Sequence, residues 1–346
     1  MADSEHRTPA SIRGFEHGLR LFIEILTKAQ RTREMKIEYQ GESRRHFLRD
    51  ATIAALAASV PQFRVPGYSK AVEPAAEAFK LRYAPPLGMF EHHAGKDPLD
   101  QIRFMADQGF RAMFDNGLMN RPEAEQESIA RETSRLKMSI GPFVSYADFS
   151  VRSFVTPDKS VRDMMAGKLQ TAIETAGRTG SKLTLVVPGR YDESTDWSYQ
   201  TSNVIENLKW CAELCEPAGL VIVIEPLNPK DHPGLFLTKM SQAYEIVRAV
   251  GSPHCKIVDD IYHQQITEGN ILPNIDACWQ EIKAFHLGDT PGRNEPGTGE
   301  LNYLTIFKHI HSKGYDGVLC MEHGKSLPGK EGEKAIIAAY RNCDNF

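Results

Sequence analysis

The chain has no excess of charge of either sign. Its 346 residues include 41 basic and 45 acidic side chains, which gives a formal net charge of −4 at pH 7. Acidic and basic residues are interspersed, and no charged tail stands out. Because nucleic-acid-binding domains usually present a basic patch to phosphates, we expect no nucleic-acid partner. A small molecule is the expected partner, and assembly into a homo-oligomer is left open.

Cysteine is scarce and scattered. The six cysteines contain no tight C-x-x-C unit, so neither a disulfide framework nor a cysteine-based zinc knot is expected. Cys211 and Cys215 lie four residues apart on a predicted helix whose apolar face carries Val204 and Leu208. We expect them to be two small buried side chains.

Long apolar runs are also missing from the N-terminal region. The apolar run at residues 51–60 has about half of the ~20 residues that a membrane-spanning helix needs, so we expect no stable membrane anchor. A short run of this kind, with basic residues before it, is typical of the central segment of a signal peptide.

The residues just before this run strengthen that interpretation. The stretch Ser43-Arg44-Arg45-His46-Phe47-Leu48-Arg49 resembles the twin-arginine export motif. We predict a signal segment at residues 43–60, within an N-terminal extension of residues 1–78 that is removed on export to the periplasm. Cleavage at Ala76-Glu77-Ala78 is one option and Ala57 or Ala58 another, and Met35 is an alternative start. If the Arg pair belongs instead to an amphipathic basic helix, the protein stays in the cytoplasm.

From Phe79 onward, short apolar runs alternate with helical patterns. Near-continuous apolar runs are typical of parallel strands buried on both faces. We predict strands at residues 81–90, 112–115, 138–146, 183–188, 220–227, 255–260, 282–287 and 317–322. Helical patterns between them end at Gly109, Gly180, Gly219 and Gly314, and Asp158, Thr201 and Thr238 or Ser241 are plausible helix starts.

This alternation predicts an α/β fold, a (β/α)8 TIM barrel at residues 79–346. The rival is a doubly wound open sheet, but no G-x-G-x-x-G follows an early strand.

Ionisable residues follow four consecutive predicted strands. TIM barrels build their active sites at the carboxyl ends of the strands, so these side chains should meet at one rim. They are Glu225, Asp260, His286 and Glu322. Three carboxylates crowded together would repel one another without a cation. This oxygen-rich set predicts one divalent metal ion, Mg²⁺ or Mn²⁺ first, with Co²⁺ or Zn²⁺ as alternatives.

Three stretches resemble the hydroxypyruvate isomerase family of the xylose-isomerase-like TIM barrels: Glu225-Pro226-Leu227-Asn228, Asp260-Ile261-Tyr262-His263, and residues 288–300 with their P-G-R-x-E-P-G-x-G-E pattern. The resemblance implies that the same four residues hold the metal, and that His263 and Arg293 bind the substrate. His286 departs from the Gln that hydroxypyruvate isomerases tend to carry, and matches the His of the ketose 3-epimerases. His92, His93 and His323 are expected to lie outside the site, with His92 and His93 pointing apart in an extended loop.

The ligand set suggests a mechanism. A metal chelated by neighbouring carbonyl and hydroxyl oxygens acidifies the C–H between them and stabilises an enediolate. We hypothesise that Glu225 and Glu322 form the catalytic acid/base pair. The resemblance implies conversion of hydroxypyruvate to tartronate semialdehyde. A ketose 3-epimerase or another sugar isomerase is the alternative, and a non-catalytic periplasmic carbohydrate-binding protein is the second.

Overall fold

The computed structural model describes residues 76–346. The predicted twin-arginine segment lies outside the described residues, so export stays a prediction. The described strands are β1 Arg82–Ala84, β2 Ala112–Met113, β3 Ser139–Ile140, β4 Phe143–Ala147, β5 Leu183–Val187, β6 Val221–Ile224, β7 Cys255–Asp260, β8 Ile282–His286 and β9 Val318–Cys320. The α-helices are α2 Glu91–Ala94, α3 Pro98–Asp107, α4 Glu123–Arg135, α5 Lys159–Thr179, α6 Trp197–Cys215, α7 Met240–Val250, α8 Ile261–Thr267, α9 Ile271–Cys278, α10 Tyr303–Ser312 and α11 Gly329–Cys343.

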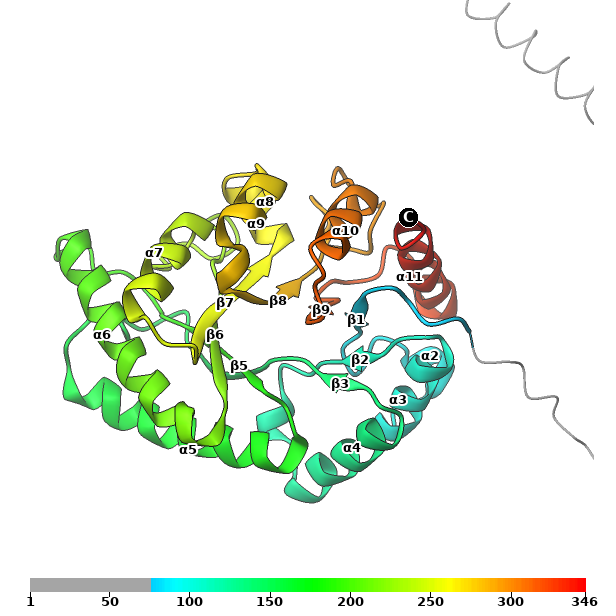
Figure 1. Cartoon of the computed structure of the whole chain (residues 1–346), viewed down its shortest axis with the longest axis horizontal. Coiled ribbons are helices and arrows are strands. Elements are labelled where there is room, and N and C mark those ends of the chain that lie inside the picture. Colours follow the sequence, from blue (N-terminus) through cyan, green and yellow to red (C-terminus); the bar gives the residue numbers. More distant parts are fainter. Residues whose placement is uncertain (1–75) are drawn as a thin grey trace, which may run out of the picture. The chain divides into compact units, whose positions relative to one another are not determined.

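All strand pairs are parallel, and the sheet closes on itself. Seven strands follow the order β1-β9-β8-β7-β6-β5-β4, so the first strand pairs with the last. The remaining pair, β2 and β3, lies between β1 and β4: Pro86 bridges to Phe114, and Gly141 N donates to Met113 O. Helices surround the strands on the outside (Figure 1). The predicted (β/α)8 TIM barrel is confirmed.

Seven of the eight predicted strands are shorter or divided in the structure, and for two of them a local reason is clear. The predicted strand at residues 81–90 ends at Ala84, because Pro85 and Pro86 follow it and proline has no N–H to continue the ladder. The predicted strand at residues 138–146 is divided into β3 and β4 by Gly141 and Pro142. A Cβ at Gly141 would lie 2.8 Å from the Phe114 Cβ, so only glycine allows the strands to approach here.

The helix ends follow the predicted glycines more closely than the helix starts follow the predicted caps. Gly180 and Gly219 adopt the left-handed conformation at C-caps, as expected. Asp158 precedes α5 as predicted, whereas α6 begins at Trp197, one turn before Thr201. Residue Met240, between the two predicted starts, begins α7.

The core has two parts. Inside the barrel lie small and branched side chains, among them Val187, Val223, Val258 and Ala284. A larger cluster fills the space between the strands and the helices, and it includes Cys211 and Cys215, which are buried and unpaired. The prediction of two buried structural cysteines is therefore confirmed.

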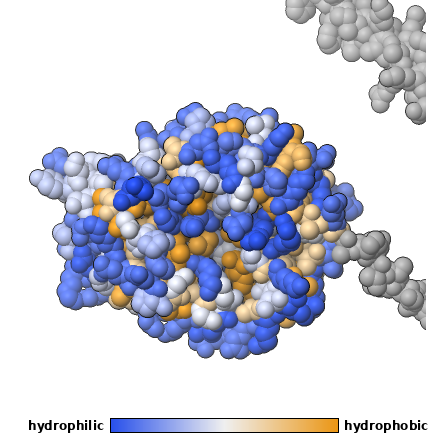
Figure 2. Space-filling model, in the orientation of Figure 1, coloured by the Kyte–Doolittle hydropathy of each residue, from blue (hydrophilic) through white to orange (hydrophobic). Residues whose placement is uncertain are grey.

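No helix within residues 76–346 is long and apolar enough to cross a bilayer. On the face shown in Figure 2, hydrophilic residues predominate and hydrophobic areas are small.

Candidate active site and metal centre

The structure brings the four predicted metal-ligating residues together at the carboxyl ends of consecutive strands. Glu225 directly follows β6, Asp260 ends β7 and His286 ends β8, and Glu322 lies just beyond β9. One ligand atom from each residue lies within 4.8 Å of those from the other three. Donor atoms that share one cation at ~2.1–2.4 Å lie no more than about 4.8 Å apart, so this spacing fits a single divalent ion.

A histidine joins two of the carboxylates. The His286 Nδ1 lies 3.0 Å from Glu225 Oε1 and 3.1 Å from Glu322 Oε2, and the His286 side chain is fully buried. Burial alone would lower the pKa of His286, but the charges of Glu322 and Glu225 raise it well above its ordinary value. Burial also raises the pKa of Glu225 to about 7, against the opposing effect of His286. In the protein without metal, the site therefore retains a proton to offset its negative charge.

Arg293 supplies the other positive charge at the rim. Its Nη2 donates to Asp260 Oδ2 at 2.8 Å and to Glu322 Oε2 at 2.7 Å. Burial opposes ionisation of Glu322, but the charges of His286 and Arg293 prevail and hold its pKa below the ordinary value. Three carboxylates compensated by one guanidinium and one shared proton form a donor set that suits a divalent cation.

His263 lies beside Arg293, as the family resemblance implied. The His263 side chain is buried, and its Nε2 is 2.8 Å from Arg293 Nη1. Burial lowers the pKa of His263 to about 4 despite the nearby charge of Asp260. Asp260 itself caps α8, because its Oδ1 accepts from the backbone N–H groups of Tyr262 and His263. The start of α8 thus determines the positions of both the candidate ligand Asp260 and His263.

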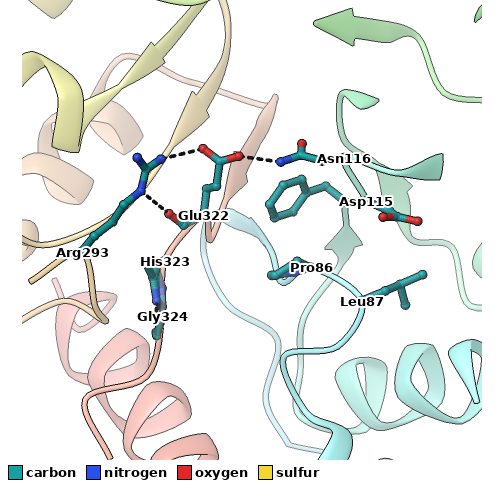
Figure 3. Close-up of a pocket in the computed structure, with 9 residues that line it drawn as sticks. Pro86, Leu87, Asp115, Asn116, Arg293, Glu322, His323 and Gly324 are labelled. Carbon is teal, nitrogen blue, oxygen red and sulfur yellow. Dashed lines mark hydrogen bonds and ion pairs between the residues drawn. The ribbon is translucent and has the colours of Figure 1, made fainter. Parts of the chain in front are cut away.

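A pocket of about 420 Å³ opens beside Glu322. The Asn116 Nδ2 donates to Glu322 Oε1 at 2.6 Å, from the side opposite Arg293 (Figure 3). Pro86, Leu87 and Phe114 form its apolar wall. Asn116 was missed by the sequence analysis, although it follows the predicted strand at residues 112–115 and the same strand-end rule would have found it.

The three histidines that were expected to lie outside the site have local partners. Both His92 Nδ1 and His93 Nδ1 contact the buried Glu333 carboxylate, at 2.9 and 2.5 Å. The expectation that these rings point apart is wrong, because they lie on the short helix α2 and not in an extended loop. The His323 Nε2 contacts the Tyr340 hydroxyl at 2.9 Å, away from the four ligands, although His323 also lines the pocket.

The glycine-rich stretch after β8 is a scaffold for Arg293. Asp289 is buried, and its carboxylate accepts from Gly297 N and Gly299 N at 2.9 Å and from Leu301 N at 3.0 Å. A Cβ at Gly299 would lie 1.8 Å from Thr290 O, which explains the glycine. Arg293 itself has a φ of 47°, a conformation uncommon for residues other than glycine. The folded loop thus determines where the guanidinium lies.

Comparison with known proteins agrees with this geometry. Residues 102–343 match the family model of the xylose isomerase-like TIM barrel, and the chain belongs to that family. It is 32% identical over 157 residues to a 2-oxo-tetronate isomerase of Cupriavidus necator and 33% identical over 152 residues to a hydroxypyruvate isomerase of Escherichia coli. These alignments cover 45% and 44% of this chain, and 60% and 59% of the length of the two relatives.

The fold has close counterparts among solved structures. An AP endonuclease of family 2 from Brucella melitensis superposes with a TM-score of 0.63 at 23% identity, over 73% of this chain and 96% of that chain. This likeness concerns the fold alone.

The contacts of Asp289 lead to a stability prediction. Asp289→Ala leaves three N–H groups without their acceptor, so we expect the free energy of unfolding to fall by on the order of 3 kcal/mol. Urea unfolding in EDTA measures this loss without a contribution from bound metal. The control is Asp276→Ala, an exposed carboxylate that contacts His309 and Lys313, where we expect a loss below about 1 kcal/mol. Equal stability of the two variants would show that Asp289 does not hold the loop.

Proposed function

We propose that this protein is a divalent-metal-dependent isomerase that moves a proton between neighbouring carbons of a small hydroxy-carbonyl compound. The observation that carries the proposal is the convergence of Glu225, Asp260, His286 and Glu322 on one site of metal-ligating size at the strand ends of a TIM barrel. Hydroxypyruvate, converted to tartronate semialdehyde, is the first candidate substrate. The names of the two relatives support an isomerase, and both act on small oxo acids by name.

The four residues would hold Mg²⁺ or Mn²⁺ first, with Co²⁺ or Zn²⁺ as alternatives. When bound, such an ion supplies positive charge that acidifies the C–H between a carbonyl and a hydroxyl. Glu225 and Glu322 come from strands on either side of β7 and β8, so they can flank a substrate. One carboxylate removes the proton and the other returns it to the neighbouring carbon.

Arg293 and His263 would bind the substrate oxygens. The guanidinium contacts two of the candidate ligands, Asp260 and Glu322, and it can pair with the carboxylate of a small oxo acid. The 420 Å³ pocket beside Glu322 supports the assignment of Arg293, which lines it together with Asn116 and Glu322.

One observation favours a second candidate. The site has an imidazole, His286, where the hydroxypyruvate isomerases tend to have Gln, and the ketose 3-epimerases have His. A ketose 3-epimerase or another sugar isomerase would use the same two carboxylates, with the proton returned to the same carbon from the other face.

Hydrogen–deuterium exchange tests the proposal. Proton NMR of the metal-loaded protein in D2O, with hydroxypyruvate and then a panel of ketohexoses, should show conversion or loss of the C–H signal. We expect EDTA to abolish the exchange and added Mg²⁺ or Mn²⁺ to restore it. Exchange only at C3 of a ketose would make the protein an epimerase. No exchange with any of these compounds would reject the proposal in favour of a carbohydrate-binding protein.

Removal of either carboxylate tests the acid/base pair. We expect Glu225→Gln and Glu322→Gln each to slow exchange by at least about 100-fold, because a general acid or base typically contributes 10²–10⁴-fold. Metal content is measured in parallel, since both residues are also candidate ligands. Glu331→Gln, an exposed change on α11, is the control and should keep wild-type exchange. Wild-type exchange in either site variant with metal still bound would show that the pair is misassigned.

We also propose export by the twin-arginine route, on the Arg44-Arg45 pair and the apolar run that follows it. In a bacterium with a twin-arginine translocase, we expect the full chain in the periplasmic fraction and the variant with Arg44→Lys and Arg45→Lys in the cytoplasm. The control replaces Arg31 and Arg33 by lysine. Equal distribution of all three proteins would place this chain outside the route.

A further inference from the structure

The buried His263 ring lies between two groups that both offer hydrogens. Its Nδ1 is 2.7 Å from Asn228 Nδ2 and 3.4 Å from Asn228 N. Its Nε2 is 2.8 Å from Arg293 Nη1. A guanidinium can only donate, and a neutral imidazole has one N–H and one lone pair. The orientation of the Asn228 amide therefore decides which nitrogen of His263 carries the proton.

That orientation is determined by the surrounding turn. The Asn228 Oδ1 accepts from the backbone N–H groups of Lys230 at 3.1 Å and Asp231 at 2.9 Å. The Asn228 Nδ2 donates to Asp231 Oδ2 at 2.9 Å, and the Tyr262 hydroxyl donates to the same oxygen. A flipped amide would place its oxygen against the Asp231 carboxylate and its NH2 group against two N–H donors. Asn228 thus presents an N–H to His263.

The two contacts of His263 cannot both be hydrogen bonds. If Nδ1 accepts from Asn228, the proton of the neutral ring is on Nε2, which then meets the Arg293 N–H donor to donor. The acceptor on this side of the ring is Asp260 Oδ2, 3.6 Å from Nε2. An imidazolium has no lone pair, so it would oppose donors at both nitrogens. Asn228 is held by two backbone groups and Asp231, whereas Arg293 retains Asp260 and Glu322 as partners if it leaves His263. The Arg293 contact is therefore the one that gives way.

We propose that Asn228 is a positioning residue that sets the tautomer of His263, with the proton on Nε2 and directed into the site. His263 then acts as a neutral hydrogen-bond donor to a substrate oxygen, and not as a base. The part of this inference that concerns the substrate rests on the proposed function. The tautomer itself does not, because Asn228, Asp231 and Tyr262 fix it before any substrate binds.

Nitrogen-15 NMR of the full protein tests the tautomer directly. The protein is labelled at histidine and loaded with Mg²⁺, and the His263 signals are identified by their loss in His263→Gln. In the wild type we expect the proton on Nε2. The double variant Asn228→Asp with Asp231→Asn replaces the side-chain donor at Nδ1 by an acceptor while it keeps the 228–231 pair and the longer backbone contact. We expect it to shift the ratio of tautomers toward Nδ1–H by roughly tenfold or more, since a lost hydrogen bond is replaced by an accepting carboxylate.

The control is Asp231→Asn alone, which leaves the Asn228 amide in place and should keep the proton on Nε2. A wild-type ring with its proton on Nδ1 would overturn the proposal even if the double variant failed to fold. So would a folded double variant with an unchanged tautomer.

Turnover separates this inference from the proposed function. With a substrate found by exchange, we expect the double variant to lower kcat by at least about tenfold and to change KM much less. The reason is that a misdirected His263 loses a hydrogen bond that stabilises mainly the transition state. A reversed tautomer with unchanged kcat would show that His263 does not donate a hydrogen bond to the substrate. Absence of exchange in the wild type would reject the isomerase and leave the NMR result standing.

Discussion

The main physical constraint on the site is the repulsion among three carboxylates that lie together at the rim of the barrel. Glu225, Asp260 and Glu322 come from three different strand ends, so the closure of the barrel itself forces their charges together. Without a metal ion, the structure compensates them with a proton at His286 and the guanidinium of Arg293. A divalent ion would supply the same compensation more compactly, which is the physical basis for expecting one.

The loop after β8 is organised around this constraint. Asp289 also lies beyond a strand end, but it turns its carboxylate toward backbone N–H groups of its own loop. The glycines of the loop permit its close backbone contacts, and Arg293 is presented to the site at a positive φ. The distinctive sequence pattern of residues 288–300 thus determines the backbone geometry of the loop, and this geometry positions the Arg293 guanidinium.

The sequence predicted the barrel and the convergence of four site residues because both follow from one rule. Buried parallel strands are apolar along their length, so an ionisable residue at the end of a run marks the rim. The rule fails where the backbone is interrupted: the prolines after Ala84 and the Gly141-Pro142 pair leave apolar runs intact but break the ladders. The strand-end rule also does not predict which side chains contact one another. Nothing in the pattern of residues shows that His92 and His93 meet on Glu333, or which atoms of Asn228 face His263.

Arg293 affects both the charge balance of the carboxylates and the hydrogen bonding of His263. The same guanidinium that offsets Asp260 and Glu322 also contacts His263 Nε2, the nitrogen that carries the proton in the proposed tautomer. In the structure the guanidinium pairs with these carboxylates and lies close to His263 Nε2, where it would oppose an N–H donor. A cation among the carboxylates would lessen their demand on Arg293 and allow it to move away from the ring. With the proposed tautomer, metal binding and the preparation of His263 as a hydrogen-bond donor would therefore be coupled through the Arg293 side chain.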